Sequence, residues 1–126
     1  MYVQRIVVPI TTDGSGNATV TTPVIDQGFL SQIRYIKDGT NPFTNGVAFA
    51  CTLVKTGEAI WSESNVNASA TRAPRQPTHG TDGTPSLYAT GGTPVQDKIA
   101  IAQDQIQVVV TGGGATKAGV IEFLIV

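Results

Sequence analysis

Residues 47–53 read Val47-Ala48-Phe49-Ala50-Cys51-Thr52-Leu53, and this stretch decides the fold class. A larger apolar side chain stands at every second position, which is the alternation expected of a β-strand with one face in a core. Phe49 and Cys51 are therefore predicted core residues. Cys51 is also the only cysteine, so an intramolecular disulfide is excluded.

Similar β-rich stretches recur on both sides of this segment. They are residues 2–10, 18–24, 28–37, 59–61, 106–110 and 120–126, while residues 99–103 fit either a short strand or a turn of helix. Turn-forming residues separate them, and the cluster at 12–17 predicts a β-hairpin between the first two stretches. Pro9 cannot donate a ladder hydrogen bond, so the first strand is expected to lie at a sheet edge or to end there. No convincing helix is present, and we predict an all-β fold, an antiparallel β-sandwich or β-barrel of roughly seven to eight strands.

Residues 65–98 interrupt this pattern. They contain four prolines and few apolar residues. A loop of this length is uncommon in a compact domain unless it is functional or disordered, and its prolines restrict the backbone. We therefore predict one β domain over residues 1–126 with a long extended arm at about 65–98, including a short strand near 86–89.

Composition narrows the classes of partner. The chain has a net charge of -1 and only 13% charged residues, without the basic face that nucleic-acid binding requires. It contains no apolar run long enough to cross a membrane, and a β-rich stretch starts at the N-terminus in place of a signal peptide. We expect a soluble protein made in a cytoplasm, with neither a nucleic-acid nor a membrane partner. Because the net charge is close to zero, copies of the chain repel one another only weakly, which favours a role within an assembly.

Residues able to perform chemistry are scarce. The single histidine, His79, lies in the long loop, where a general base is poorly positioned for catalysis. One histidine and one cysteine do not make a transition-metal site. The turn at 13–17 lacks the glutamate of a calcium loop, and residues 112–119 lack the Gly-Lys-Ser/Thr of a phosphate loop. We predict no enzyme activity, no catalytic residues, no metal and no cofactor.

Contact with other proteins is the remaining role for the polar surface. Trp61, beside the polar loop, could anchor a partner or pack in the core. Arg72 and Arg75 flank Pro74, where they could bond across an interface or be solvated charges. The candidate interface residues are Tyr2, Trp61, Arg72, Arg75, His79 and Tyr88.

Several stretches together resemble the small structural proteins of tailed bacteriophages, above all their capsid decoration, or cement, proteins. The resemblance runs from about Gln32 to the C-terminus and carries over no individual functional residue. Its stretches are Ile33-Arg34-Tyr35-Ile36, Pro74-Arg75-Gln76-Pro77, residues 87–93 (LYATGGT) and residues 104–114 (DQIQVVVTGGG).

The resemblance implies a β-rich protein, often a homotrimer, that binds the outside of an expanded icosahedral shell and staples neighbouring capsomers. The implied partners are the major capsid protein and further copies of this chain. The implied location is the capsid surface of the virion, after assembly in the host cytoplasm. We expect residues 65–98 and the N-terminal segment to make most contacts, and deletion of residues 70–85 to leave a folded core that no longer binds capsids.

Two other functions remain open. The chain could be a head–tail connector or a tail- or fibre-associated structural protein, which particles hold in far fewer copies. It could also be a carbohydrate-binding β-sandwich, although its aromatic content of 6% is low for a sugar-stacking surface.

Overall fold

The computed structural model describes residues 3–126, so the interface candidate Tyr2 lies outside the described residues. The described residues form strands and no α-helix, which confirms the all-β prediction. Among them no helix could therefore span a membrane. The strands are β1 (Gln4–Thr11), β2 (Ala18–Thr21), β3 (Ile25–Lys37), β4 (Ala48–Leu53), β5 (Ala59–Glu63), β6 (Ala70–Arg72), β7 (Gln76–Pro77), β8 (Gln96–Asp97), β9 (Ile99–Asp104), β10 (Ile106–Thr111) and β11 (Ala118–Ile125).

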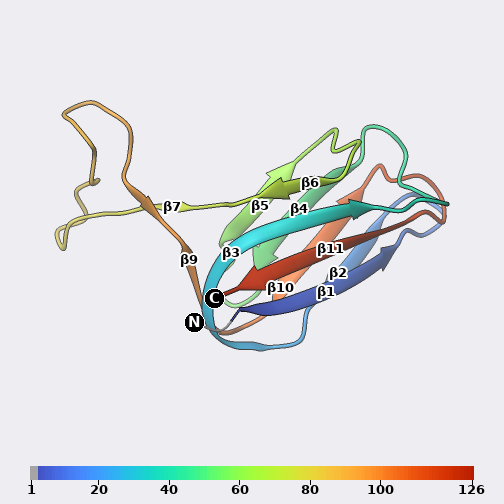
Figure 1. Ribbon diagram of the computed structural model, residues 1–126, viewed down its shortest axis with the longest axis horizontal. Coiled ribbons are helices and arrows are strands. Elements are labelled where there is room, and N and C mark those ends of the chain that lie inside the picture. Colours follow the sequence, from blue (N-terminus) through green and yellow to red (C-terminus); the bar gives the residue numbers. More distant parts are fainter. Residues whose placement is uncertain (1–2) are drawn as a thin grey trace.

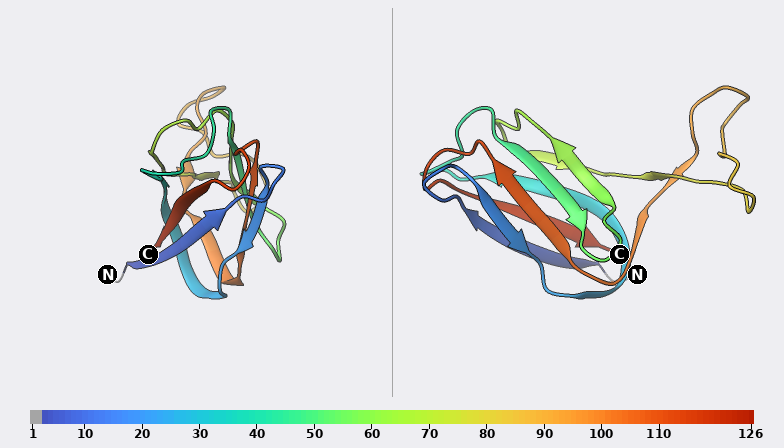
Figure 2. Two further views of the ribbon diagram at one scale, coloured as in Figure 1. Left: turned by 90° about the vertical axis from the view of Figure 1, so that its right-hand side faces the viewer. Right: turned by 180° about the vertical axis from the view of Figure 1, so that it is seen from behind.

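Two antiparallel sheets make the body of the molecule (Figure 1). The first sheet has the order β1-β11-β3-β6, with β9 also paired to β3, and the second has the order β2-β10-β4-β5. Strands β7 and β8 pair only with each other, outside the body (Figure 2). More strands form than the expected seven or eight because β6, β7 and β8 have two or three residues each, too few to show an alternation.

The core lies between the two sheets, where their inward side chains meet. The alternation in β4 is confirmed, because Phe49, Cys51 and Leu53 are buried while their neighbours are partly exposed. The Phe49 ring lies 4.8 Å from that of Tyr35 and 5.3 Å from that of Trp61, centroid to centroid. These contacts place the most strongly predicted strand at the centre of an aromatic cluster.

The expected hairpin at residues 12–17 is wrong. Strand β1 pairs with β11 in the first sheet, and β2 pairs with β10 in the second. The turn instead crosses between the sheets, held by the Thr12 hydroxyl, which donates to the Gly114 carbonyl oxygen at 2.6 Å. Turn chemistry predicts a reversal of the chain but does not choose which strand receives the ladder bonds. Strand β1 does lie at a sheet edge, as Pro9 predicted.

One edge of β3 carries two separate strands. Leu30 faces Ile125 of β11 on one side and Ile99 of β9 on the other. Ile33 likewise faces β11 on one side and Arg72 of β6 on the other. Strands β6 and β9 therefore lie end to end along one edge of β3, and the chain leaves the body between them (Figure 1).

The projecting arm is shorter than predicted, and we define it as residues 73–98. Residues 65–72 belong to the body, since Val66 is buried in the core and β6 joins the first sheet. No strand forms at 86–89, where only the isolated bridge between Leu87 and Pro94 occurs. A deletion of residues 70–85 would thus remove a strand of the sheet together with half of the arm. Residues 99–103, which were ambiguous, form β9.

Candidate interaction surface

The arm projects from one end of the sandwich and folds back upon itself (Figure 2). Backbone hydrogen bonds organise it: the N–H of Thr78 donates to Val95 at 2.9 Å, and that of Val95 donates to Ser86 at 2.8 Å. The N–H of Ser86 in turn donates to Thr78 at 3.0 Å. These bonds tie the outgoing, central and returning segments of the arm together.

Two tight turns complete the arm. In the first, the N–H of Gly80 donates to Thr84 at 2.8 Å. The backbone N–H of Thr84 also donates to the Asp82 carboxylate, and this bond lowers the pKa of Asp82. In the second, the N–H of Gly92 donates to Ala89 at 2.8 Å. The arm is thus a small meander with a defined backbone.

None of the arm residues 73–98 is fully buried. Tyr88 is 75% exposed and Leu87 is 39% exposed. Ordering a residue costs about 1–2 kcal/mol of backbone entropy, which proteins usually offset by burying apolar surface. The arm buries little of its own, so its side chains are available to a partner. We therefore take it as the candidate interaction surface.

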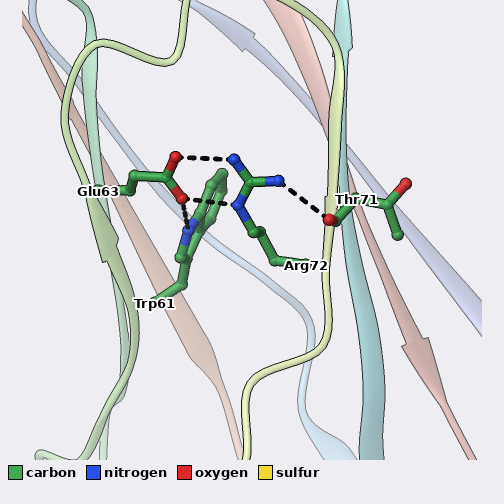
Figure 3. Close-up of polar contacts among 4 residues, drawn as sticks. All are labelled: Trp61, Glu63, Thr71 and Arg72. Atoms are coloured by element: carbon green, nitrogen blue, oxygen red, sulfur yellow. Dashed lines mark hydrogen bonds and ion pairs between the residues drawn. The ribbon is translucent and has the colours of Figure 1, made fainter.

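A polar cluster holds the chain where it enters the arm (Figure 3). The Nε and Nη2 atoms of Arg72 donate to the two carboxylate oxygens of Glu63, both at 2.8 Å. The Trp61 indole N–H donates to Glu63 Oε1 at 3.1 Å. Strand β5 is the edge of the second sheet and β6 an edge of the first, so this cluster joins the two sheets along one side.

The same bonds set the electrostatics of the cluster. Hydrogen bonds from Arg72 and Trp61 lower the pKa of Glu63 to about 2, and the carboxylate raises the pKa of Arg72 in return. The bidentate geometry also fixes the orientation of the guanidinium. Arg72 is the last residue of β6, so this ion pair holds the chain one residue before the arm begins.

Arg75 holds the next part of the arm. Its Nη1 atom donates to the backbone oxygens of Ser31 at 3.1 Å and Pro74 at 2.9 Å. Ser31 lies on β3 in the gap between β6 and β9. Arg75 therefore satisfies a backbone oxygen that no strand reaches, and it fastens the arm to the body.

A shallow groove lies beside the place where the arm begins and ends. It has a volume of about 380 Å³. A second hollow of about 310 Å³ shares Phe29 and Val126 with it and also borders Asp97 and Lys98. Phe29 is 49% exposed, which is unusual for phenylalanine. The groove is lined by Gln4, Gln27, Gly28, Phe29, Ile125 and Val126.

Gly28 makes this groove possible. Its φ is +143°, and a Cβ atom there would overlap the Ile125 side chain and lie 2.9 Å from the Val126 oxygen. Phe29 and Val126 exchange backbone hydrogen bonds of 2.8 and 2.9 Å. The glycine lets the end of the chain approach β3 closely, while Phe29 is directed outward.

The structure divides the predicted interface residues into two groups. Trp61, Arg72 and Arg75 lie at the base of the arm, and His79 and Tyr88 lie exposed on the arm itself. Trp61 is only 8% exposed and packs against Phe49, so the core-packing alternative holds for it. Neither arginine is merely solvated, since both make bonds within the chain.

Sequence reasoning missed Glu63 and Phe29. Glu63 stands two residues after Trp61, and in a strand this spacing places both side chains on one face, a signal that could have been used. For Phe29 the sequence signal is weak, because both Phe29 and Leu30 are apolar and only the structure shows that Leu30 faces the core and Phe29 faces outward. The part of the chain that the structure describes contains no group of three or more His, Cys, Asp or Glu side chains able to hold a metal ion. The absence of catalysis stays a prediction.

No protein-family model matches the chain, and no curated protein matches its sequence. Among solved structures, the chain is similar to one described as the crystal structure of FLHE, with 9% sequence identity and a TM-score of 0.44. The alignment covers 98% of this chain and 95% of that chain. At this identity and TM-score, the likeness supports neither a family nor a function.

Proposed function

We propose that this protein is a capsid decoration, or cement, protein of a tailed bacteriophage. It binds the outer shell as a homotrimer and stabilises neighbouring capsomers. The observation that carries the proposal is the arm, a projection with a defined backbone in which no side chain is fully buried. The resemblance of the sequence to phage decoration proteins supports the same function.

The mechanism follows from a rigid body and a directed arm. The Glu63–Arg72 ion pair and the Arg75 bonds hold the base of the arm, so that little orientational entropy is lost when the arm meets a partner. A homotrimer on a local three-fold axis repeats each contact three times, and avidity multiplies a modest affinity. A homotrimer bound in this way resists separation of the capsomers that it contacts.

The arm tip, residues 78–95, suits a contact that does not depend on charge. Its only acidic residue is Asp82, and it contains no lysine or arginine. Contacts of this kind are weakly screened by salt, unlike those made by charged surfaces. We expect decoration to persist at high ionic strength.

Copy number in purified particles tests the proposal. Quantitative mass spectrometry would measure this chain against the major shell protein, with a portal protein as an internal standard for low copy number. A ratio near one to one, or one trimer for each local three-fold axis, supports decoration. A handful of copies assigns the chain to the connector or tail, and absence from particles overturns a role in the virion.

A further inference from the structure

We propose that the arm of one copy inserts its tip residues, Leu87 and Tyr88, into the Phe29–Val126 groove of a neighbouring copy. This inference deepens the proposed function, because it names a partner for the arm. It rests on that function only for its biological setting, since the contact needs no shell. It is therefore tested on the isolated protein.

The two surfaces are chemically complementary. The groove exposes the Phe29 ring beside Ile125, Val126 and two glutamines, and the tip exposes Tyr88 and Leu87. Tyrosine pairs an apolar ring with a hydroxyl that bonds to amide groups, and such residues anchor many protein interfaces. Asp97 and Lys98 beside the groove carry opposite charges that offset each other, which suits a tip with Asp82 as its only acidic residue and no lysine or arginine.

A copy cannot fill its own groove. The base of the arm is fastened by the Glu63–Arg72 ion pair and by Arg75. From there the arm runs away from the body, so that its far end points away from the C-terminus (Figures 1 and 2). Because the groove contains Val126 at the C-terminal end, the tip of the same chain stays away from it. A tip that enters this groove therefore comes from another copy.

We expect the contact to close into a ring. Each copy donates one tip and accepts another, which is a heterologous interface, and such interfaces form closed rings when the rotation between copies closes. The arm and the groove lie at the same end of the sandwich, so all arms of a ring would cross at one face (Figure 1). A ring of three copies matches the proposed homotrimer.

Sedimentation velocity of the purified chain, over a range of concentrations and without any shell, tests the contact. We expect the unchanged protein to form a single oligomer. Two variants, Phe29→Ala in the groove and Leu87→Ser/Tyr88→Ala in the tip, should each weaken self-association by about tenfold or more, the effect typical of a central anchor. Ile36→Ala, which also truncates an exposed apolar side chain, should leave it unchanged. Circular dichroism confirms that each variant is folded.

Mixing the two variants gives the decisive result. The tip variant keeps its groove and the groove variant keeps its tip, so an equimolar mixture should form one contact and sediment as a one-to-one pair. The inference is overturned if the unchanged protein is monomeric at all concentrations, or if the tip variant forms the same oligomers as the unchanged protein. It is also overturned if the mixture of the two variants stays monomeric. The copy number in particles is measured separately, so the proposed function can stand when this contact fails.

Discussion

Glu63 accepts three hydrogen bonds and joins the edge strands of the two sheets (Figure 3). An exposed ion pair usually contributes little to stability, because both long side chains lose freedom and water screens the charges. The pair with Arg72 differs in its bidentate geometry and in the indole N–H that orients the carboxylate. Its main effect is local: it holds the end of β6 where the arm starts.

We expect Glu63→Gln to lower the free energy of unfolding by about 1 kcal/mol at neutral pH, a value for a pair exposed to solvent. Folding lowers the pKa of Glu63 from 4.5 to about 2, so the stabilisation comes from the ionised carboxylate. It is fully present above the unfolded pKa of 4.5 and is lost as the pH falls toward 2. Urea unfolding of both proteins across this range measures the difference.

The difference in free energy of unfolding between the unchanged protein and Glu63→Gln should be constant near neutral pH and should shrink in acid. Arg72→Gln provides the matched control, because it removes the other half of the same pair. In the double variant the two losses should not add, as expected for residues in direct contact. A difference that does not change with pH would contradict the role given to the Glu63 charge.

At the scale of elements, the arm interrupts a single edge strand. Strands β6 and β9 run in the same direction along one edge of β3, with Arg72 facing Ile33 and Ile99 facing Leu30. On the opposite edge of β3, Phe123 of β11 faces Ile33 and Ile125 faces Leu30. Only one residue, Leu124, lies between them, and the register shifts there. The two edges differ because a long segment is inserted into one of them.

Deletion of residues 74–98, which joins Ala73 directly to Ile99, should therefore restore a continuous strand. Ala73 would then be the single residue between Arg72 and Ile99, as Leu124 is the single residue between Phe123 and Ile125 on the other edge of β3. With this spacing Ile99 still faces inward. We expect an all-β circular dichroism spectrum and a cooperative thermal transition. The variant should also lose self-association and shell binding, since it lacks the tip.

A deletion one residue shorter is the control for this prediction. Removing 75–98 with Pro74→Thr leaves one extra residue, which turns Ile99 outward because a strand alternates its faces. Its melting temperature should be several degrees lower than that of the 74–98 deletion. Deletion of residues 70–85 should be more damaging, since it removes β6 and the partner of Glu63. An unfolded 74–98 variant would show that the arm is needed by the body.

At the scale of the whole molecule, stability comes from one shared core. Residues of both sheets bury their apolar side chains together, so neither sheet is stable without the other. Cys51 lies fully buried on β4, between β10 and β5, near the middle of this core. Burial raises the pKa of its thiol to about 12, so that it stays protonated at neutral pH.

Labelling of Cys51 should therefore report global unfolding. We expect a thiol reagent such as Ellman's reagent to react with it only at the rate at which the whole sandwich opens. The rate should rise with urea in parallel with the loss of circular dichroism. Val54→Cys in a Cys51→Ala background is the control, and this exposed position should react at once. Rapid labelling of Cys51 in the native protein would show that the core opens locally.

The local sequence was sufficient to predict an all-β fold and the existence of an extended arm. Alternation at 47–53 and 106–110 predicted strands because β-strands alternate their faces, and that rule needs no partner. The prolines of residues 74–94 likewise predicted that this segment lies outside the two main sheets. Of the candidate surface, His79 and Tyr88 could be placed on the arm from sequence, because an exposed loop needs no knowledge of packing.

Strand partners and the base of the arm were decided by the tertiary structure. The turn at 12–17 reverses the chain whether β1 pairs with β2 or with β11. The pairing with β11 places β1 in the first sheet, whose inner face is buried against the second. Strand β6 exists because β3 offers a free edge, and Glu63 meets Arg72 because the sheet edges come together there. Periodicity and turn residues act over a few neighbours, whereas pairing and packing depend on which distant surfaces bury each other.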